Sequence, residues 1–299
     1  MGKKSYGWLL LVLLTLLLGA CSEEGNSEAS SSDDVVDIVW YPSESGSDMK
    51  SSRDDIGEVI ADATGREVKH HLTTDYAISI ETMVNNNAEL AFMGAQGYIE
   101  AKERNDAIQP LVVSTGESGT LDDAVYHSWL AVNVDDVNNY KENGEFSLDT
   151  IADKKMSFVS NSSTSGFKVP ASDLIAHFSD KSLTEEDLME GGPLFSQVLF
   201  GNSHQGSAVN LLKGSADVAA FCDTCVENYV ELVEGEANRP GSIYRVKDNA
   251  AEPFSLVKGK EFVLISVTPV LNAPFVGNID LLGEEGFKKL QDYLSSDEV

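Results

Sequence analysis

The sequence predicts an α/β protein in which mostly parallel sheets are covered by helices. Short apolar runs alternate along the chain with stretches whose apolar residues recur at helical spacing. This alternation is typical of parallel sheets with helices on both faces. The composition, 299 residues with 42% apolar and 23% charged residues, describes a globular chain. That length is enough for one large domain or for two lobes of roughly 130 residues, each with its own core.

The N-terminus predicts an export signal followed by a lipid anchor. Two lysines precede the apolar run 8–18, which is too short to span a membrane. The run ends in Leu-Gly-Ala-Cys, the pattern of a bacterial lipobox, so we expect cleavage of residues 1–20 and a lipid on Cys21. The alternative is an ordinary signal peptide followed by a chance cysteine. Residues 21–34 contain almost nothing apolar and are predicted as a flexible tether.

Strands and helices are expected in turn along the rest of the chain. Strands are expected at 37–41, 90–94, 129–134, 156–160, 217–221 and 262–267. Helices are expected near residues 56–63 (closed by Gly65), 169–178, 208–212 and 287–294. The polar stretches 134–145 and 234–239 are expected as surface loops.

The charge balance limits the possible partners. The chain carries 21 Lys and Arg against 49 Asp and Glu, a formal net charge of −28. So acidic a surface repels the phosphate backbone, and we therefore expect no nucleic-acid partner.

Four consecutive hydroxyl residues follow the expected strand at 156–160. The run Ser162-Ser163-Thr164-Ser165 stands directly before a predicted helix. In parallel sheets, ligands lie at the carboxyl ends of strands, close to helix N-termini with unpaired N–H groups. The run is therefore a candidate oxyanion site that needs no Lys or Arg. The alternative is simple helix capping, for which one hydroxyl is enough.

Two further loops carry candidate site residues. His204 stands between Ser203 and Gln205 at an expected helix start. A histidine there is either a structural residue or a donor to a bound anion. Cys222 and Cys225 form a Cys-x-x-Cys motif with Asp223 between them. If Cys21 is lipidated, the remaining even pair in an oxidising compartment favours a structural disulfide or two unreactive thiols over a zinc or redox site.

Together these loops resemble the substrate-binding protein of phosphonate/phosphite ABC importers, over about residues 35–294. The most specific element is the segment 163–167 with Val169-Pro170 following, which in this family wraps the phosphonate oxygens. Asp75-Tyr76-Ala77 matches a motif whose tyrosine hydroxyl reaches the ligand. His204 matches a histidine in a Gly/Ser-rich loop before a helix.

The sequence departs from the family pattern at other positions. Met93 stands where the family has a ligand-contacting tyrosine, and Asn272 where it has an acid that meets a substrate amine. A further family acid falls near Asp223 or Glu227. These departures count against an aminoalkylphosphonate ligand and leave the oxyanion-binding segment in place.

The resemblance implies a two-lobed type II periplasmic-binding-protein fold with two hinge segments and the ligand between the lobes. Lobe 1 is expected to be residues 35–127 and 267–299, and lobe 2 residues 128–266. The expected ligand-binding residues are Tyr76, Met93, Ser163, Thr164, Ser165, His204, Asp223 and Asn272.

The function that the resemblance implies is that of a monomeric, non-enzymatic receptor without a cofactor or metal. It would capture a small phosphorus oxyanion outside the cytoplasmic membrane and deliver it to an ABC permease. A receptor of the same fold for a sulfonate or a thiamine-related pyrimidine is the alternative. An enzyme would use Ser163 as nucleophile and His204 as base. The sequence has no Gly-x-Ser-x-Gly elbow, which counts against this hypothesis. A redox or metal-handling lipoprotein would use Cys222 and Cys225.

Overall fold

The computed structural model describes residues 34–296. The predicted signal peptide, the predicted lipidation site Cys21 and all of the predicted tether except Asp34 lie outside this part of the chain. Within the described residues, no helix has both the length and the apolar content needed to cross a membrane. Both sheets described below belong to one structural unit that begins at Val35.

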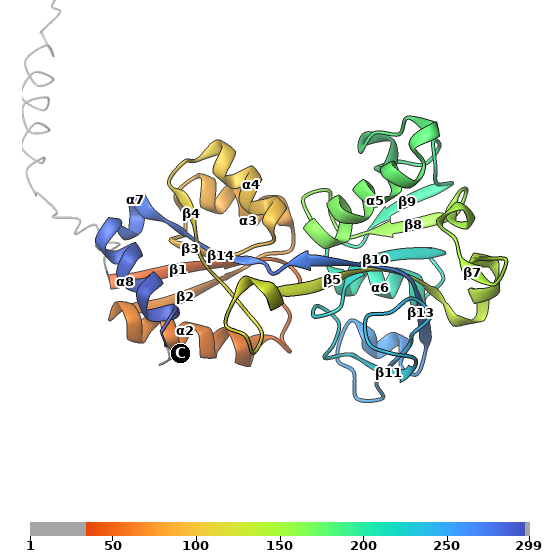
Figure 1. Cartoon of the computed structure of the whole chain (residues 1–299). Coiled ribbons are helices and arrows are strands. Elements are labelled where there is room, and N and C mark those ends of the chain that lie inside the picture. Colours follow the sequence, from red (N-terminus) through yellow and green to blue (C-terminus); the bar gives the residue numbers. More distant parts are fainter. Residues whose placement is uncertain (1–33, 297–299) are drawn as a thin grey trace, which may run out of the picture. The chain divides into compact units, whose positions relative to one another are not determined.

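The first sheet combines strands from the start and the end of the chain in the order β2-β1-β3-β14-β4 (Figure 1). Its strands are β1 (Val35–Trp40), β2 (Glu67–Leu72), β3 (Leu90–Phe92), β4 (Ile108–Val113) and β14 (Pro274–Asn278). Strand β1 pairs in parallel with β2 and β3, whereas β14 is antiparallel to both β3 and β4. The end of the chain therefore completes the sheet that its start begins.

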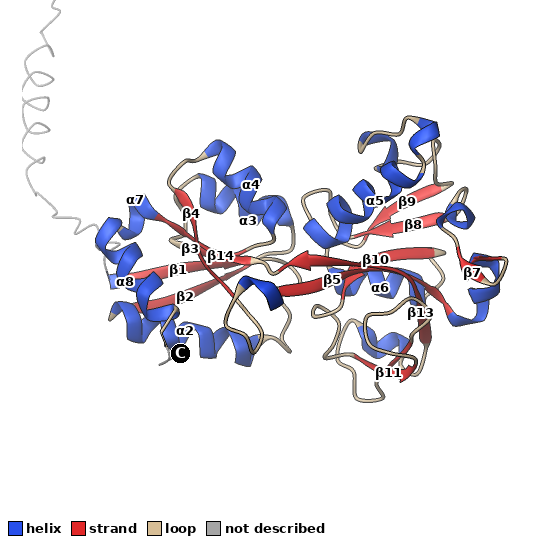
Figure 2. Cartoon of the chain, viewed as in Figure 1, coloured by secondary structure: helices blue, strands red, loops and turns tan. Residues whose placement is uncertain are grey.

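Helices cover both faces of the first sheet (Figure 2). They are α2 (Lys50–Thr64), α3 (Tyr76–Val84), α4 (Ala95–Arg104), α7 (Ile279–Leu282) and α8 (Glu284–Leu294). Side chains of β1 alternate between the faces, as the pleat requires. Ile38 packs in one core with Ile60 of α2 and Leu290 of α8, and Val39 packs in the other with Ile80 of α3. As predicted, α2 ends at Gly65, whose left-handed φ of 72° favours glycine.

The second sheet has the order β11-β12-β13-β5-β10-β8-β9. Its strands are β5 (Val125–Asn133), β8 (Lys155–Phe158), β9 (Gln197–Phe200), β10 (Val218–Cys222), β11 (Val230–Glu234), β12 (Ile243–Val246) and β13 (Glu261–Leu271). Only β10, β8 and β9 pair in parallel with one another, and the other ladders are antiparallel. The sheets are therefore mixed rather than mostly parallel, because the chain enters the second sheet along β5 and leaves it along the antiparallel β13.

Shorter elements and two main helices surround the second sheet. The helices are α5 (Val169–His177) and α6 (His204–Leu212), and the π-helical turn η5 (Thr164–Lys168) leads into α5. The 3-10 segments are η2 (Leu121–Asp123), η3 (Val134–Tyr140), η4 (Leu148–Ile151), η6 (Ser179–Lys181), η7 (Glu186–Leu188) and η8 (Phe254–Val257). Strands β6 (Lys141–Glu142) and β7 (Glu145–Phe146) form a hairpin, so the predicted loop at 134–145 has local structure of its own.

We call the first sheet with α2, α3, α4, α7 and α8 the first lobe, and the second sheet with η5, α5 and α6 the second lobe. The chain passes between the two sheets at residues 114–124 and 272–273. The β5/β13 ladder extends to the pair Val125↔Leu271, a few residues beyond the divisions at 127/128 and 266/267 that the sequence suggests. Where the lobes hinge stays a prediction.

Candidate functional site

A cavity of about 300 Å³ is lined by residues of both lobes. The first lobe contributes Tyr41, Ser43, Glu44, Met49, Tyr76, Phe92 and Gly94. The second lobe contributes Tyr126, Ser163, Thr164, Ser165, His204, Gln205, Cys222, Thr224 and Cys225, and the connections contribute Ser114, Asn272 and Ala273. Among these described residues there is no Lys or Arg. An anion in the cavity must therefore be held by uncharged donors.

Ser163 is the N-cap of the turn η5, in the loop that follows strand β8. Its hydroxyl oxygen accepts a hydrogen bond from the main-chain N–H of Gly166 at 3.1 Å. Gly166 is needed here, since a Cβ at this position would lie 2.2 Å from Cγ2 of the buried Val159. Because Ser163 accepts from the main chain, its own O–H can donate toward the cavity.

Two other hydroxyls of the run, those of Thr164 and Ser162, contact the first lobe. The hydroxyl oxygen of Thr164 accepts from the main-chain N–H of Gln96 in α4 at 2.9 Å. Ser162, which does not line the cavity, donates to a carboxylate oxygen of Glu100 at 2.9 Å. The carbonyl of Ser165 accepts from the hydroxyl of Ser128 at 2.7 Å, and this leaves the Ser165 side chain at the cavity wall.

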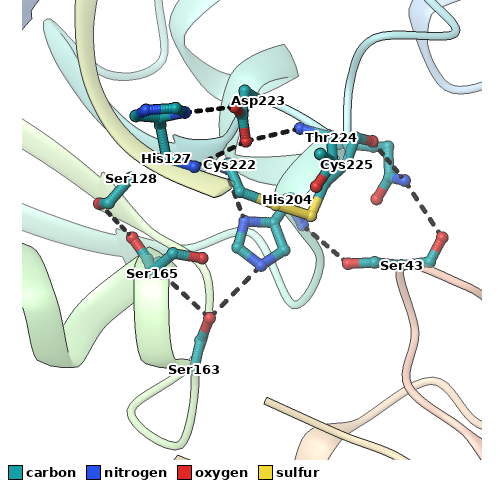
Figure 3. Close-up of a disulfide and its surroundings, with 12 residues drawn as sticks. Ser43, His127, Ser128, Ser163, Ser165, His204, Cys222, Asp223, Thr224 and Cys225 are labelled. Atoms are coloured by element: carbon teal, nitrogen blue, oxygen red, sulfur yellow. Dashed lines mark hydrogen bonds and ion pairs between the residues drawn. A yellow bond between two sulfur atoms is a disulfide. The ribbon is translucent and has the colours of Figure 1, made fainter. Parts of the chain in front are cut away.

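His204 is the first residue of α6 and is buried. Its Nδ1 accepts a hydrogen bond from the main-chain N–H of Cys222 at 3.1 Å. Burial lowers the pKa of His204 to about 3, so the ring is neutral. A neutral ring whose Nδ1 accepts carries its hydrogen on Nε2, and Nε2 lies 3.5 Å from Oγ of Ser163 (Figure 3). His204 therefore presents an N–H donor to the cavity.

Three tyrosines line the cavity, namely Tyr41, Tyr76 and Tyr126, although the hydroxyl of Tyr41 is itself fully buried. The rings of Tyr41 and Tyr76 lie 4.2 Å apart between centroids. Burial, aided by the charge of Glu44, raises the pKa of Tyr76 despite hydrogen bonding to Ser43 and Ser163. Burial also raises the pKa of Tyr126 to about 12. The phenols of Tyr76 and Tyr126 stay protonated at neutral pH and can act as donors, and Tyr76 lines the cavity.

Met93 and Asp223 are in different places from those predicted. Met93 is fully buried in the core between the first sheet and α3, while its neighbour Phe92 lines the cavity, because successive side chains of a strand point to opposite faces. The Asp223 carboxylate accepts from the main-chain N–H of His127 at 2.9 Å and pairs with that ring's Nδ1 at 2.8 Å. Strand β5 therefore holds Asp223 outside the cavity lining.

Asn272 lines the cavity from the second connection between the sheets. Its side-chain amide donates to the carbonyl of Ser114, in the first connection, at 2.8 Å. Asn272 thus ties the two connections together at the point where they pass the cavity.

Cys222 and Cys225 are joined by a disulfide that forms part of the cavity wall (Figure 3). The ligand atoms of His204, Cys222 and Cys225 lie within 4.8 Å of one another, a grouping that can suit a metal ion. Here the two sulfurs are bonded to each other, so neither is a thiolate that could bind a metal. The disulfide instead anchors the segment whose main-chain N–H orients His204.

The turn that follows β1 also belongs to the site, a role that sequence reasoning missed. Ser43 accepts from the main-chain N–H of His204 at 3.3 Å, and the Gln205 side chain donates to the Ser43 carbonyl at 3.1 Å. Glu44, next along the chain, brings the only acidic side chain of the described lining. The available signal was a polar turn directly after a buried strand, the same position that drew attention to the hydroxyl run.

Two α/β lobes joined by two connections, with a cavity of uncharged donors between them, define the class of bilobal solute-binding proteins. The sequence matches the family model described as "ABC transporter, phosphonate, periplasmic substrate-binding protein" over residues 38–298. The chain belongs to this family. It is an extracytoplasmic substrate-binding component of an ABC importer and not an enzyme. The predicted family and two-lobed binding-protein fold are confirmed.

Named relatives agree with this membership. The chain is 25% identical over 279 residues to a phosphate-import protein, PhnD, of Mycolicibacterium smegmatis, covering 92% of this chain and 83% of that protein. It resembles in fold a binding protein component of an ABC phosphonate transporter from Pseudomonas aeruginosa (TM-score 0.62, 20% identity, 86% of this chain and 72% of that one). It likewise resembles PhnD1 of Prochlorococcus marinus in complex with methylphosphonate (TM-score 0.62, 17% identity, 87% and 84%).

Proposed function

We propose that the cavity captures a small phosphorus oxyanion of the phosphonate, phosphite or phosphate class and holds it with uncharged donors. The observation that carries this proposal is the arrangement of Ser163, Thr164, Ser165 and the Nε2–H of His204 around one cavity without Lys or Arg in its described lining. Tyr76 adds a phenolic hydroxyl from the opposite lobe. A tetrahedral anion offers three or four acceptor oxygens, which such a donor set can satisfy.

The energetics of this arrangement explain how so acidic a protein can bind an anion. Its net charge of −28 opposes the approach of an anion at long range, but salt screens this field beyond about 8 Å. At short range, each hydrogen bond to a charged oxygen contributes roughly 1.5–3 kcal/mol. A few such bonds are enough for tight binding, and contacts from both lobes favour the closed arrangement.

The relatives support phosphorus over other tetrahedral anions. One of them is named for phosphate import and another was solved with methylphosphonate. A receptor for a sulfonate is the competing proposal within the same fold. In the family resemblance Asn272 stands where an acid meets a substrate amine, and this argues against a ligand amine at that position.

A thermal-shift panel tests the proposal. We expect phosphate, phosphite or methylphosphonate to raise the melting temperature, because a ligand that binds only the folded state stabilises it. Aminoethylphosphonate and methanesulfonate should have smaller effects. A shift with methanesulfonate alone would overturn the phosphorus assignment, and no shift with any of the five would overturn the proposed site.

The anchoring of the protein is a separate proposal. The lipobox pattern ending at Cys21 supports lipidation after removal of residues 1–20, with the acyl chains holding the receptor beside its permease. Metabolic labelling with a palmitate analogue should mark the wild-type protein and not Cys21→Ser. Equal labelling of both would contradict the lipid anchor.

A further inference from the structure

Glu44 is a half-buried acid for which the proposed site has assigned no role. It lies in the turn between β1 and α2, and its side chain lines the cavity. One carboxyl oxygen, Oε2, has no solvent exposure and no hydrogen-bond partner among the described residues. Leaving a buried polar atom without a partner is costly, and a ligand in the cavity that this residue lines would supply a partner for the carboxyl group.

The surrounding charged and titratable groups do not neutralise this carboxyl. The guanidinium of Arg53 in α2 donates to the main-chain carbonyls of Glu44 and Gly46 rather than to the carboxyl oxygens. The remaining ionisable groups of the described lining are neutral ones: the phenols Tyr41, Tyr76 and Tyr126, and the imidazole of His204.

An ionised Glu44 and an oxyanion would therefore share one small cavity with no basic side chain in its lining. Two like charges so close together in one small cavity disfavour each other, and one of the two groups takes up a proton. Burial already raises the pKa of Glu44 to about 8, against the weaker opposing effects of its own main-chain hydrogen bond and of Arg53.

We propose that Glu44 is a specificity-determining residue that shares one proton with the bound anion, so that the complex holds a single O–H···O bond between its carboxyl group and a ligand oxygen. This inference rests on the proposed function. When both partners start ionised, the proton comes from solvent: carboxylate, dianion and one H⁺ combine into the complex. The ligand class is then an oxyanion that carries a proton at neutral pH or accepts one from a carboxylic acid.

The other donors in the cavity explain why one acid is useful there. Hydroxyls and N–H groups can each satisfy a deprotonated oxygen, but a P–OH group needs an acceptor. Glu44 supplies the acceptor that a singly protonated phosphorus anion requires. A fixed set of donors and one acceptor discriminates by protonation state, because a mismatched ligand leaves a buried group unpaired.

Isothermal titration calorimetry with methylphosphonate at about pH 9 tests this inference. Titrations in two buffers of different ionisation enthalpy measure the number of protons taken up on binding. We expect about one proton for the wild-type protein and none for Glu44→Gln, which keeps the size of the side chain but cannot ionise. Glu142→Gln, an exposed residue of the β6–β7 hairpin, is the matched control and should take up as many protons as the wild type.

A second measurement covers the case in which Glu44→Gln binds too weakly for calorimetry. In the wild-type complex at about pH 9, either the ¹³C shift of the Glu44 carboxyl or the ³¹P shift of methylphosphonate should report a protonated oxygen. Two results would overturn the role of Glu44 and leave the proposed function standing. One is binding without proton uptake, and the other is a pair of spectra in which both the Glu44 carboxyl and the methylphosphonate are fully deprotonated. A failure of every phosphorus anion to bind would instead overturn the proposed function itself.

Discussion

The main-chain N–H of Cys222 donates to Nδ1 of His204 at 3.1 Å, and this bond determines which nitrogen of the ring faces the cavity as a donor. The disulfide between Cys222 and Cys225 closes the same segment. A single strand end, β10, therefore sets both the position and the tautomer of the site histidine. The ring of His204 acts as a neutral donor and not as a cation.

The first prediction concerns the effect of His204 on stability. Its pKa is about 3 in the folded protein against an ordinary value of 6.5, so the unfolded chain binds an extra proton between these values. The free energy of unfolding should therefore decrease as pH falls from about 6.5 toward 3. Urea unfolding of the wild type and His204→Gln across this range should show a steeper decrease in the wild type. His177→Gln, an exposed histidine, is the control, and parallel curves for wild type and His204→Gln would contradict a buried neutral ring.

The second prediction concerns the hydroxyl run. Replacing Thr164 and Ser165 together by Ala should weaken phosphonate or phosphite binding by about tenfold or more, given the contribution of one hydrogen bond to a charged oxygen. Calorimetry measures the change. Ser162→Ala is the matched control, because Ser162 belongs to the same run but bonds to Glu100 outside the cavity lining. Equal losses of affinity in both variants would mean that these hydroxyls hold the two lobes together and do not bind the ligand.

The sequence predicts the fold class well because its signals are local. The apolar runs at β1 and β10 and the glycine that ends α2 each follow from the period of one element. Short or proline-containing strands such as β9 and β14 lack such a signal, and so does the antiparallel return of β13 that makes the sheets mixed. Strand order depends on contacts between distant segments, which periodicity does not encode.

The site is predictable where several unusual residues stand together and not where one ordinary residue acts alone. The run that ends at Ser165 is conspicuous in any sequence, whereas Glu44 is one of 49 acidic residues and nothing local separates it from a surface carboxylate. Met93 shows the opposite error. A shift of one residue at the end of β3 places its side chain in the core and Phe92 at the cavity.

The third prediction concerns the cost of burying Glu44 in the ligand-free protein. Its pKa is raised from 4.5 to about 8, so its contribution to stability is fully present below about pH 4.5 and is lost as pH rises through 8. Glu44→Gln does not ionise and should gain stability relative to the wild type across this range. Melting temperatures measured from pH 5 to 9 check this expectation. A constant difference between the two proteins would show that the carboxyl is hydrated in the free state.

The last prediction tests the close packing that shapes the hydroxyl turn. An alanine at Gly166 would place its Cβ 2.2 Å from Cγ2 of Val159, a buried side chain that cannot move aside without disturbing the core. Gly166→Ala should therefore lower the melting temperature and, by shifting Ser163, also weaken binding of methylphosphonate. Gly286 lies in α8 with open space around it, and Gly286→Ala should leave binding unchanged and stabilise the helix by about 0.5–1 kcal/mol.

The two glycine variants together separate backbone effects from packing effects. Both add one methyl group, but only Gly166 faces the wall that positions a site hydroxyl, since the Val159 N–H donates to the Gly166 carbonyl at 3.1 Å. If Gly166→Ala bound methylphosphonate as tightly as Gly286→Ala, the turn would tolerate displacement and its hydroxyls would not need a fixed geometry. Weakened binding in Gly166→Ala alone would mean that selectivity for the anion depends on a rigid arrangement of uncharged donors.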